Sequence, residues 1–207
     1  DIESAKRIGN RAHWLVPLGV KTQLEAIGIT NVTELNWWEK MAVPNNNVEG
    51  VFTPAMHWTG RSLTDRNTAL WGSFIVRTPT FSFFFAGDTA YCDVFKLIGK
   101  YYGPFDLSLI PIGAYEPRWF MRDVHVDPKE AVQIHKDLQS KQSLAIHWAT
   151  FKLTTEPLLA PAYDLDAARI EAGVSKDEFF TITPGATHTV GEEAESDYAT
   201  ENRERAI

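Results

Sequence analysis

Residues 128–147 read PKEAVQIHKDLQSKQSLAIH, an amphipathic helix followed by a short apolar strand. We expect the helix over 128–138, because Pro128 suits a first helical turn and Asp127 can cap it. The strand is expected over 143–147, and the run DLSLIPI predicts an earlier strand over 106–112. Strand, helix and strand therefore alternate in this part of the chain.

The rest of the chain fits the same class of fold. The runs ALWGSFIVR and TFSFFFA, residues 69–77 and 80–86, predict a hairpin joined through Thr78 and Pro79. Further strands are expected at 13–17, 31–36, 48–53 and 179–182, and further helices at 19–27, 93–102 and 165–172. A hairpin followed by alternating helices and strands predicts an α/β fold whose sheets are covered on the outside by helices.

Composition excludes several classes of protein. The chain has 207 residues, enough for one domain with a real core. Twenty basic and 27 acidic residues give a net charge of −7, which argues against a general nucleic-acid binder. No uncharged apolar run approaches the roughly 18 residues of a membrane-spanning helix, so no transmembrane segment is predicted. The single cysteine, Cys92, excludes an intrachain disulfide and a zinc site built from cysteines.

The charge is concentrated at the C-terminal end. Residues 191–207, GEEAESDYATENRERAI, carry six acidic and two basic residues. Because this segment has few large apolar side chains to bury, we expect an acidic, disordered tail. The folded domain is expected within residues 1–190.

Three side chains that can bind metals follow three separate predicted strands. His57 follows the strand at 48–53, Asp88 follows the aromatic strand at 80–86, and His147 ends the strand at 143–147. Strand ends bring side chains together, and zinc accepts imidazole and carboxylate ligands. An aspartate after a glycine is more often a turn or cap, and a strand-end histidine is more often structural. On spacing alone, both interpretations stay open.

Four motifs carry a resemblance to a known family. FAGDTAYC at 85–92 resembles the metallo-β-lactamase superfamily motif that contains a strand-end aspartate. GPFDLSLIPIGAYEPRWFM at 103–121, HVDPKEA at 125–131 and HWATF at 147–151 are more particular. Together they closely resemble the N-acylphosphatidylethanolamine-hydrolysing phospholipase D family, in the family's order, from about residue 14 to about residue 185.

The resemblance implies a fold, a cofactor and a set of site residues. The fold would be the C-terminal part of a metallo-β-lactamase-type αβ/βα four-layer sandwich. His57 falls on a ligand of a first zinc ion, Asp88 on the catalytic carboxylate that bridges two zinc ions, and His147 on a ligand of the second. His125 falls on a histidine that binds the substrate phosphate. The implied reaction is zinc-dependent phosphodiester hydrolysis that releases N-acylethanolamine and phosphatidic acid.

One departure from the family pattern is large. The family's His-x-His-x-Asp-His motif belongs a short distance before Trp14, and the sequence does not contain it. We therefore expect residues 1–190 to form a metallo-β-lactamase-like domain that lacks its N-terminal half. Two zinc ions that share Asp88 need about seven protein donors. This chain supplies three donors, so on its own it is expected to bind zinc weakly and to be inactive. The full-length protein is expected to be an active enzyme.

The resemblance also implies a phospholipid substrate at a membrane surface, with intracellular, peripheral membrane association. Residues 117–121, PRWFM, place a cation beside amphipathic side chains that suit an interface, although Trp119 and Phe120 packed in the core fit equally well. The sequence leaves open whether the protein forms a homodimer. Alternative functions are hydrolysis of another ester or a lactone on the same fold, or a catalytically inactive fragment. An assay of phospholipid against lactone separates the phospholipase D function from hydrolysis of another ester or a lactone.

Overall fold

The computed structural model describes residues 1–43, 47–60, 62 and 64–190. Its strands are β1 (Trp14–Pro17), β2 (Val32–Leu35), β3 (Lys40–Ala42), β4 (Glu49–Thr53), β5 (Ser73–Arg77), β6 (Ser82–Phe85), β7 (Leu107–Pro111), β8 (Gln142–Ile146) and β9 (Phe179–Phe180). Its helices are α1 (Ile2–Ile8), the 3-10 turn η1 (Gly9–Arg11), α2 (Lys21–Glu25), α3 (Val94–Tyr102), α4 (Arg118–Met121), α5 (Pro128–Asp137) and α6 (Ala160–Ala172).

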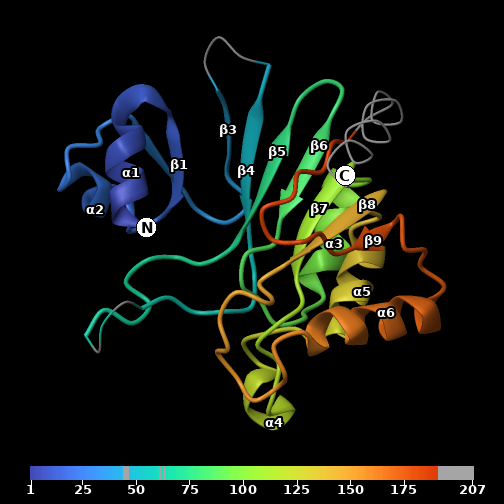
Figure 1. Cartoon of the computed structure of the whole chain (residues 1–207). Coiled ribbons are helices and arrows are strands. Elements are labelled where there is room, and N and C mark those ends of the chain that lie inside the picture. The colour runs from blue at the N-terminus through green and yellow to red at the C-terminus, as the bar shows by residue number, and fades with distance from the viewer. Residues whose placement is uncertain (44–46, 61, 63, 191–207) are drawn as a thin grey trace, which may run out of the picture.

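Strands β3 to β9 form one seven-stranded sheet in chain order. Neighbours from β3 to β6 pair antiparallel, which confirms the predicted hairpin of β5 and β6, and neighbours from β6 to β9 pair parallel. The parallel strands are connected through α3, α5 and α6, which lie together on one side of the sheet (Figure 1). The predicted α/β class, with helices covering a sheet, is confirmed.

Helix α5 forms where the sequence predicts it because both its start and its apolar face are well defined. The Asp127 carboxylate accepts a hydrogen bond from the backbone N–H of Glu130, and the Glu130 side chain reaches back to the N–H of Asp127. This reciprocal capping box, with proline in the first turn, satisfies donors that a helix start leaves unpaired. Ala131, Val132 and Ile134 are buried on the face turned towards the sheet.

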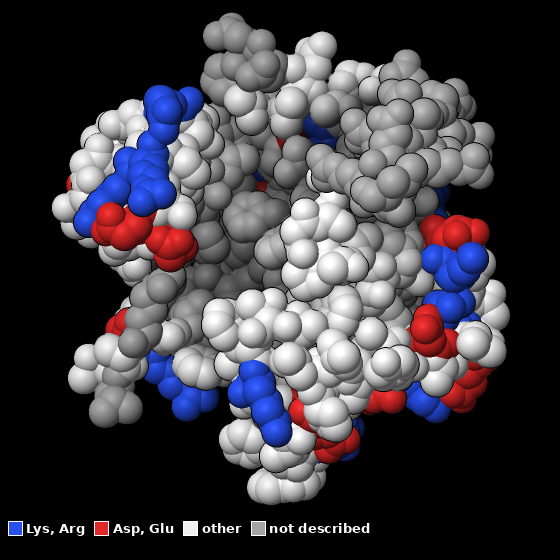
Figure 2. Space-filling model, viewed as in Figure 1, with Lys and Arg blue, Asp and Glu red and all other residues white. Residues whose placement is uncertain are grey.

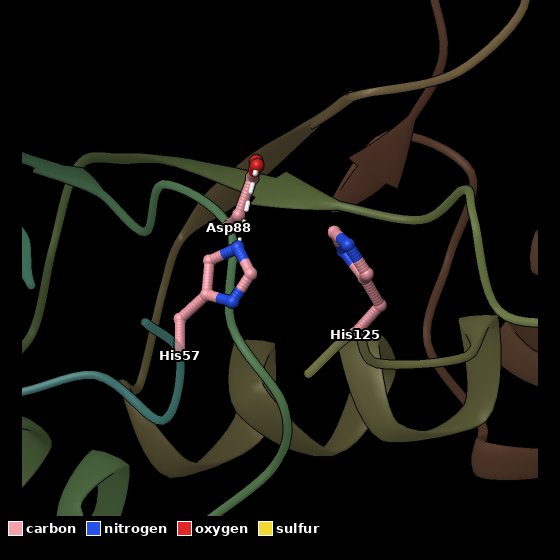
Figure 3. A group of neighbouring side chains, drawn as sticks. All are labelled: His57, Asp88 and His125. Atoms are coloured by element: carbon pink, nitrogen blue, oxygen red, sulfur yellow. Dashed lines mark ion pairs between the residues drawn. The ribbon is translucent and has the colours of Figure 1, made fainter. Parts of the chain in front are cut away.

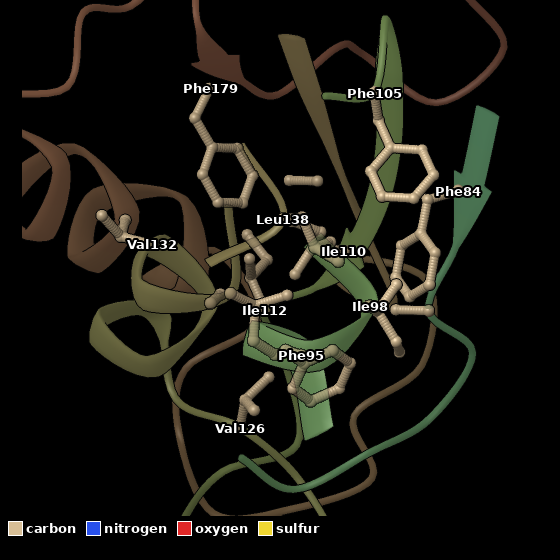
Figure 4. Close-up of a cluster of buried hydrophobic side chains, with 14 of the residues drawn as sticks. Phe84, Phe95, Ile98, Phe105, Ile110, Ile112, Val126, Val132, Leu138 and Phe179 are labelled. Atoms are coloured by element: carbon tan, nitrogen blue, oxygen red, sulfur yellow. The ribbon is translucent and has the colours of Figure 1, made fainter. Parts of the chain in front are cut away.

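The main core fills the space between the sheet and these helices (Figure 4). Its fully buried aromatic side chains are Phe84, Phe95, Phe105 and Phe179. Helices α3 and α5 approach closely at Gly99, where a Cβ atom would overlap the backbone carbonyl of Asp137. This packing fixes α5, and with it the loop that precedes α5.

The opposite face of the sheet is apolar but only partly covered within the described part of the chain. Phe74, Val76, Phe83 and Phe85 alternate with the buried residues of β5 and β6, and Val76 and Phe85 are exposed. A sheet with one covered face predicts polar residues on the other. Apolar residues there leave a surface that is suited to packing rather than to solvent.

The first 36 residues form a small lobe beside the sheet, drawn in blue in Figure 1. The predicted strands at 13–17 and 31–36 pair in parallel as β1 and β2. Val16, Ile29 and Val32 belong to a separate buried cluster. The lobe is joined to the main body by hydrogen bonds such as that from the backbone N–H of Leu70 to the carbonyl of Leu18.

Several boundaries differ from the sequence prediction, most clearly those of α6, β5 and β9. Helix α6 begins at Ala160 rather than at residue 165, because Pro161 suits its first turn. Strand β5 begins at Ser73 rather than at residue 69, and β9 is only two residues long. Strand β3 was not predicted. The acidic tail at 191–207, predicted to be disordered, lies outside the described residues.

Candidate metal centre

The site lies at one edge of the seven-stranded sheet. Strand β4 is related to β6 by two antiparallel steps, so β4, β6, β7 and β8 all run in the same direction. Their carboxyl ends therefore meet at one edge. His57 lies four residues beyond β4, Asp88 three residues beyond β6, and His147 directly after β8. His125 comes from the loop between β7 and α5, at the same edge.

The Asp88 carboxylate lies between two imidazoles. Its Oδ2 atom is 3.7 Å from Nε2 of His57, and its Oδ1 atom is 3.7 Å from Nε2 of His147. Each carboxylate oxygen thus faces a different histidine. The structure brings together the three residues that the sequence analysis selected as metal ligands.

His125 lies in the same cluster. Its ring centre is 5.2 Å from that of His57 and 5.1 Å from that of His147, against which it stacks. Ligand atoms of His57, Asp88 and His125 all lie within 4.8 Å of one another (Figure 3). By position, His125 is as well placed to bind a metal as to bind a substrate phosphate.

Thr89 ties together three of the loops that carry these side chains. It is fully buried; its hydroxyl accepts a hydrogen bond of 3.0 Å from the backbone N–H of Met56, and its carbonyl accepts one of 2.8 Å from Val126. Met56 and Val126 are the immediate neighbours of His57 and His125 in the sequence. The residue after Asp88 therefore sets the positions of both histidine loops.

The backbone at the site adopts conformations that are rare for ordinary residues. Gly87 has φ +66°, which lets the chain turn sharply before Asp88. His147 and Ala114 have φ of 58° and 64° without being glycine, a conformation that is uncommon for residues with a Cβ atom. Gly113 is required by close approach, because a Cβ atom there would overlap the carbonyl oxygen of His147.

Arg118 holds the His125 loop, and its position corrects part of the sequence prediction. The sequence analysis placed this cation at an interface with Trp119 and Phe120. Its guanidinium instead points inward: it donates a 2.7 Å hydrogen bond to the carbonyl of His125 and pairs with the carboxylates of Asp127 and Glu130. Trp119 and Phe120 are 79% and 64% exposed, so they are not core residues.

The electrostatics of the cluster favour a bound cation. Interaction with His57, opposed by burial and reinforced by the other histidines, lowers the pKa of Asp88 below its usual range. Burial, followed by the proximity of His147, lowers the pKa of His125 to about 4. At neutral pH the site therefore presents an ionised carboxylate and a neutral His125 imidazole.

The donor set fits a metal ion. Three imidazoles and one carboxylate are ligands that zinc and several other transition metals accept. The Nδ1 atoms of His57, His125 and His147 are buried and have no hydrogen-bond partner within the described part of the chain. Buried unpaired polar atoms are rare and costly. Three in one cluster indicate side chains arranged to bind a ligand.

A cleft opens beside the cluster. It has a volume of about 550 Å³ and is lined by His57 and Asp88, by Trp58 and Trp71, and by residues of the N-terminal lobe such as Val20. A substrate can therefore reach the carboxylate from this side.

The fold and this centre define a class of protein. Residues 2–148 match a family model described as the beta-lactamase superfamily domain, and the chain belongs to this superfamily. The structure is similar to Igni18, a metallo hydrolase from Ignicoccus hospitalis, with a TM-score of 0.69 over 93% of this chain and 73% of Igni18. It is also similar to CmlA, a diiron β-hydroxylase from Streptomyces venezuelae, with a TM-score of 0.60 over 81% of this chain and 38% of CmlA. At 19% and 17% identity, these two show the fold alone, and the expected metallo-β-lactamase-type fold is confirmed.

Relatives found by sequence point to a particular family within this superfamily. The chain is 45% identical over 173 residues to N-acyl-phosphatidylethanolamine-hydrolyzing phospholipase D 1 of Caenorhabditis elegans, covering 78% of this chain and 49% of that protein. It is 40% identical over 181 residues to the mitochondrial enzyme of the same name from Saccharomyces cerevisiae, covering 84% of this chain and 38% of that protein. The chain thus spans half or less of the length of these relatives. The resemblance stated from the motifs is confirmed.

Sequence reasoning missed the residues that hold the site in place. Thr89, Gly113 and Arg118 lie inside the recognised motifs, but their local spacing carries no sign of a role. Their partners are distant in sequence or are backbone atoms, and only the folded chain brings them together.

Proposed function

We propose that this protein is a metal-dependent phosphodiester hydrolase of phospholipase D type that cleaves N-acylphosphatidylethanolamine. The observation that carries the proposal is the Asp88 carboxylate, which presents one oxygen to His57 and the other to His147, while the His125 ring stacks on His147 and meets His57 edge-on. The names of the nematode and yeast relatives supply the substrate. The chain's own contribution is a carboxylate and three imidazoles at one sheet edge.

The proposed cofactor is zinc, as two ions in the complete site, with His57, Asp88 and His147 as ligands. Bound zinc supplies polarisation of phosphate oxygens and a lowered pKa for bound water. His125, neutral at pH 7, can donate its ring N–H to a phosphate oxygen. In the reaction, water adds its oxygen to phosphorus and the bond from phosphorus to the ethanolamine oxygen breaks. The leaving oxygen takes the proton, so the products are phosphatidic acid and N-acylethanolamine.

The proposed location is a membrane surface within the cell, and α4 is the proposed contact. Trp119 and Phe120 are exposed on α4, and at the lower end of the molecule, where α4 lies, uncharged surface is bordered by both basic and acidic side chains (Figure 2). Aromatic side chains of this kind suit the interface between lipid and water. The yeast relative is named mitochondrial. Within the described part of the chain, no helix is long and apolar enough to cross a membrane.

The test is an assay of the full protein, expressed from its complete coding sequence, on N-acylphosphatidylethanolamine, phosphatidylcholine and a lactone. We expect release of N-acylethanolamine that is lost with a chelator and restored by Zn²⁺. Asp88→Asn and His57→Gln should abolish turnover, while the exposed matched controls Asp93→Asn and His188→Gln should retain it. Turnover of lactone without turnover of the phospholipid, or full activity of Asp88→Asn, would refute the proposal.

A further inference from the structure

A second, smaller cavity adjoins the metal centre. It has a volume of about 260 Å³ and lies between the loop after β7 and the loop that connects β8 to α6. His147 is part of its wall, whereas His57 and Asp88 line the larger cleft. The cluster therefore lies between two cavities, and a molecule held at Asp88 can extend into both.

The small pocket is apolar. Trp148, Phe151, Leu153 and Leu158 line it, and the last three are 75%, 65% and 41% exposed. These side chains stand open to solvent beside a cavity, where an apolar ligand would remove their surface from water. The gain is roughly 25 cal/mol for each Å² of apolar surface that is buried.

The buried carboxylate in the wall, that of Glu156, is not free to bind a polar ligand. The Glu156 carboxylate is buried and already accepts hydrogen bonds from the backbone N–H groups of Ala114, Tyr115 and Glu116 and from the hydroxyl of Thr154. The other charged side chain, Lys152, is exposed, so its ammonium group can stay in water. Apart from this side chain, the pocket offers a largely apolar wall to a ligand that enters it.

The larger cleft has a different character. Asp65, Thr59 and Thr68 contribute polar groups to its wall, and its volume is about twice that of the pocket.

A phosphodiester has two arms that leave the phosphorus in different directions. One arm of the substrate in the proposed function carries a single acyl chain through the ethanolamine nitrogen, and the other carries two acyl chains through glycerol.

We propose that the pocket of Trp148, Phe151, Leu153 and Leu158 binds the N-acyl chain of the leaving alcohol. This inference rests on the proposed function. A pocket of about 260 Å³ lies at the small end of the range for ligand sites, about 300–1,000 Å³, and it suits one chain better than two. Its position beside His147 places that chain within reach of a phosphate held by the cluster.

The test measures how affinity depends on chain length. Butanoyl-, hexanoyl- and octanoyl-ethanolamine are titrated into the full, metal-loaded protein by calorimetry, which needs no turnover. Each CH₂ group buried in the pocket is worth about 0.8 kcal/mol, which corresponds to a roughly fourfold gain in affinity. We expect this gain per CH₂ until the pocket is full and a plateau beyond it.

Variants then locate the effect. Leu153→Asp and Leu158→Asp place a charge in the pocket at positions that are already exposed, so the fold should survive. Both should flatten the dependence on chain length, while Leu159→Asp, an exposed neighbour outside the lining, should leave it unchanged.

The outcomes separate the pocket from the reaction. Affinity that is independent of N-acyl length, or unchanged in Leu153→Asp and Leu158→Asp, would overturn the pocket even if the phospholipid is hydrolysed. The expected dependence on length without hydrolysis would support the pocket and refute the proposed function.

Discussion

The substitution Glu156→Gln removes the anion that joins the loop after β7 to the loop after β8. The carboxylate Oε1 accepts hydrogen bonds from the N–H groups of Ala114 at 2.7 Å and Tyr115 at 3.3 Å. Its Oε2 accepts from the N–H of Glu116 at 3.2 Å and from the hydroxyl of Thr154 at 2.6 Å. A glutamine keeps one oxygen but presents an NH₂ group where the second oxygen was.

The cost follows from these contacts. Two hydrogen bonds change from a charged to a neutral acceptor, and each loses about 1 kcal/mol. The N–H of Glu116 then faces another donor, and a buried unpaired donor costs about 1–3 kcal/mol. Because a neutral side chain is less costly to bury than a charged one, we expect a net loss of about 2–4 kcal/mol in the free energy of unfolding.

The pH dependence provides a second signature. Burial opposes ionisation of Glu156, but its hydrogen bonds outweigh burial and lower its pKa below the usual value. The stabilisation is therefore present above the carboxyl pKa of the unfolded chain, about 4.3, and is lost as the pH falls through the lower pKa of the folded state. The difference between the wild type and Glu156→Gln should shrink over that range.

Urea denaturation at pH 7 and at acidic pH measures both effects, with the exposed Glu171→Gln as the control for losing one negative charge. Hydrogen exchange of residues 113–116 should quicken in Glu156→Gln. A variant within about 0.5 kcal/mol of the wild type at pH 7, the range of ordinary surface changes, would refute the assigned role.

Three further predictions concern the site and its supports. Arg118→Met removes charged hydrogen bonds, so it should lower the free energy of unfolding, measured in urea, by about 1–3 kcal/mol. It should also raise KM, because the loop that carries His125 is released. A wild-type KM would contradict the role of Arg118 in holding this loop. Burial lowers the pKa of His135 in the folded state, so the free energy of unfolding is highest above the unfolded-state pKa of about 6.5 and falls as the pH decreases. The thermal unfolding temperature of His135→Gln should therefore depend less on pH between 7 and 5 than that of the wild type. An equal pH dependence would count against the burial argument. The double variant Trp119→Ala, Phe120→Ala should weaken binding to phospholipid vesicles in sedimentation assays about a hundredfold or more, given roughly 1.5–3 kcal/mol for each of the two large apolar side chains if both are buried in the membrane. Unchanged binding would place the membrane contact elsewhere.

Local patterns were enough to predict most of the secondary structure. Helix α5 carries its own start signals at Asp127 and Pro128 and its own apolar face, so its position needed no tertiary information. The hairpin of β5 and β6 could likewise be predicted from the local sequence alone. Strand β3 was missed, because Lys40–Ala42 is short and largely exposed at the sheet edge, with no alternating apolar pattern.

The convergence of His57, Asp88 and His147 could be anticipated only in part. Their places at strand ends were visible, but the shared edge depends on β4 running parallel to β6, which is a property of the whole sheet. The positions of supporting groups such as Arg118 depend on contacts with backbone atoms. No residue pattern encodes those contacts, because any carbonyl can accept a hydrogen bond.

Calorimetric titration of the protein with Zn²⁺ tests most directly whether the strand-end cluster is a metal site. Losing a residue that only orients a metal ligand lowers metal affinity roughly 10–100-fold. Asp88→Asn removes a ligand itself, so it should lower zinc affinity by at least this factor. The control Asp93→Asn should bind zinc with wild-type affinity. Zinc affinity and stoichiometry in Asp88→Asn equal to those of the wild type would contradict a metal centre built around this carboxylate.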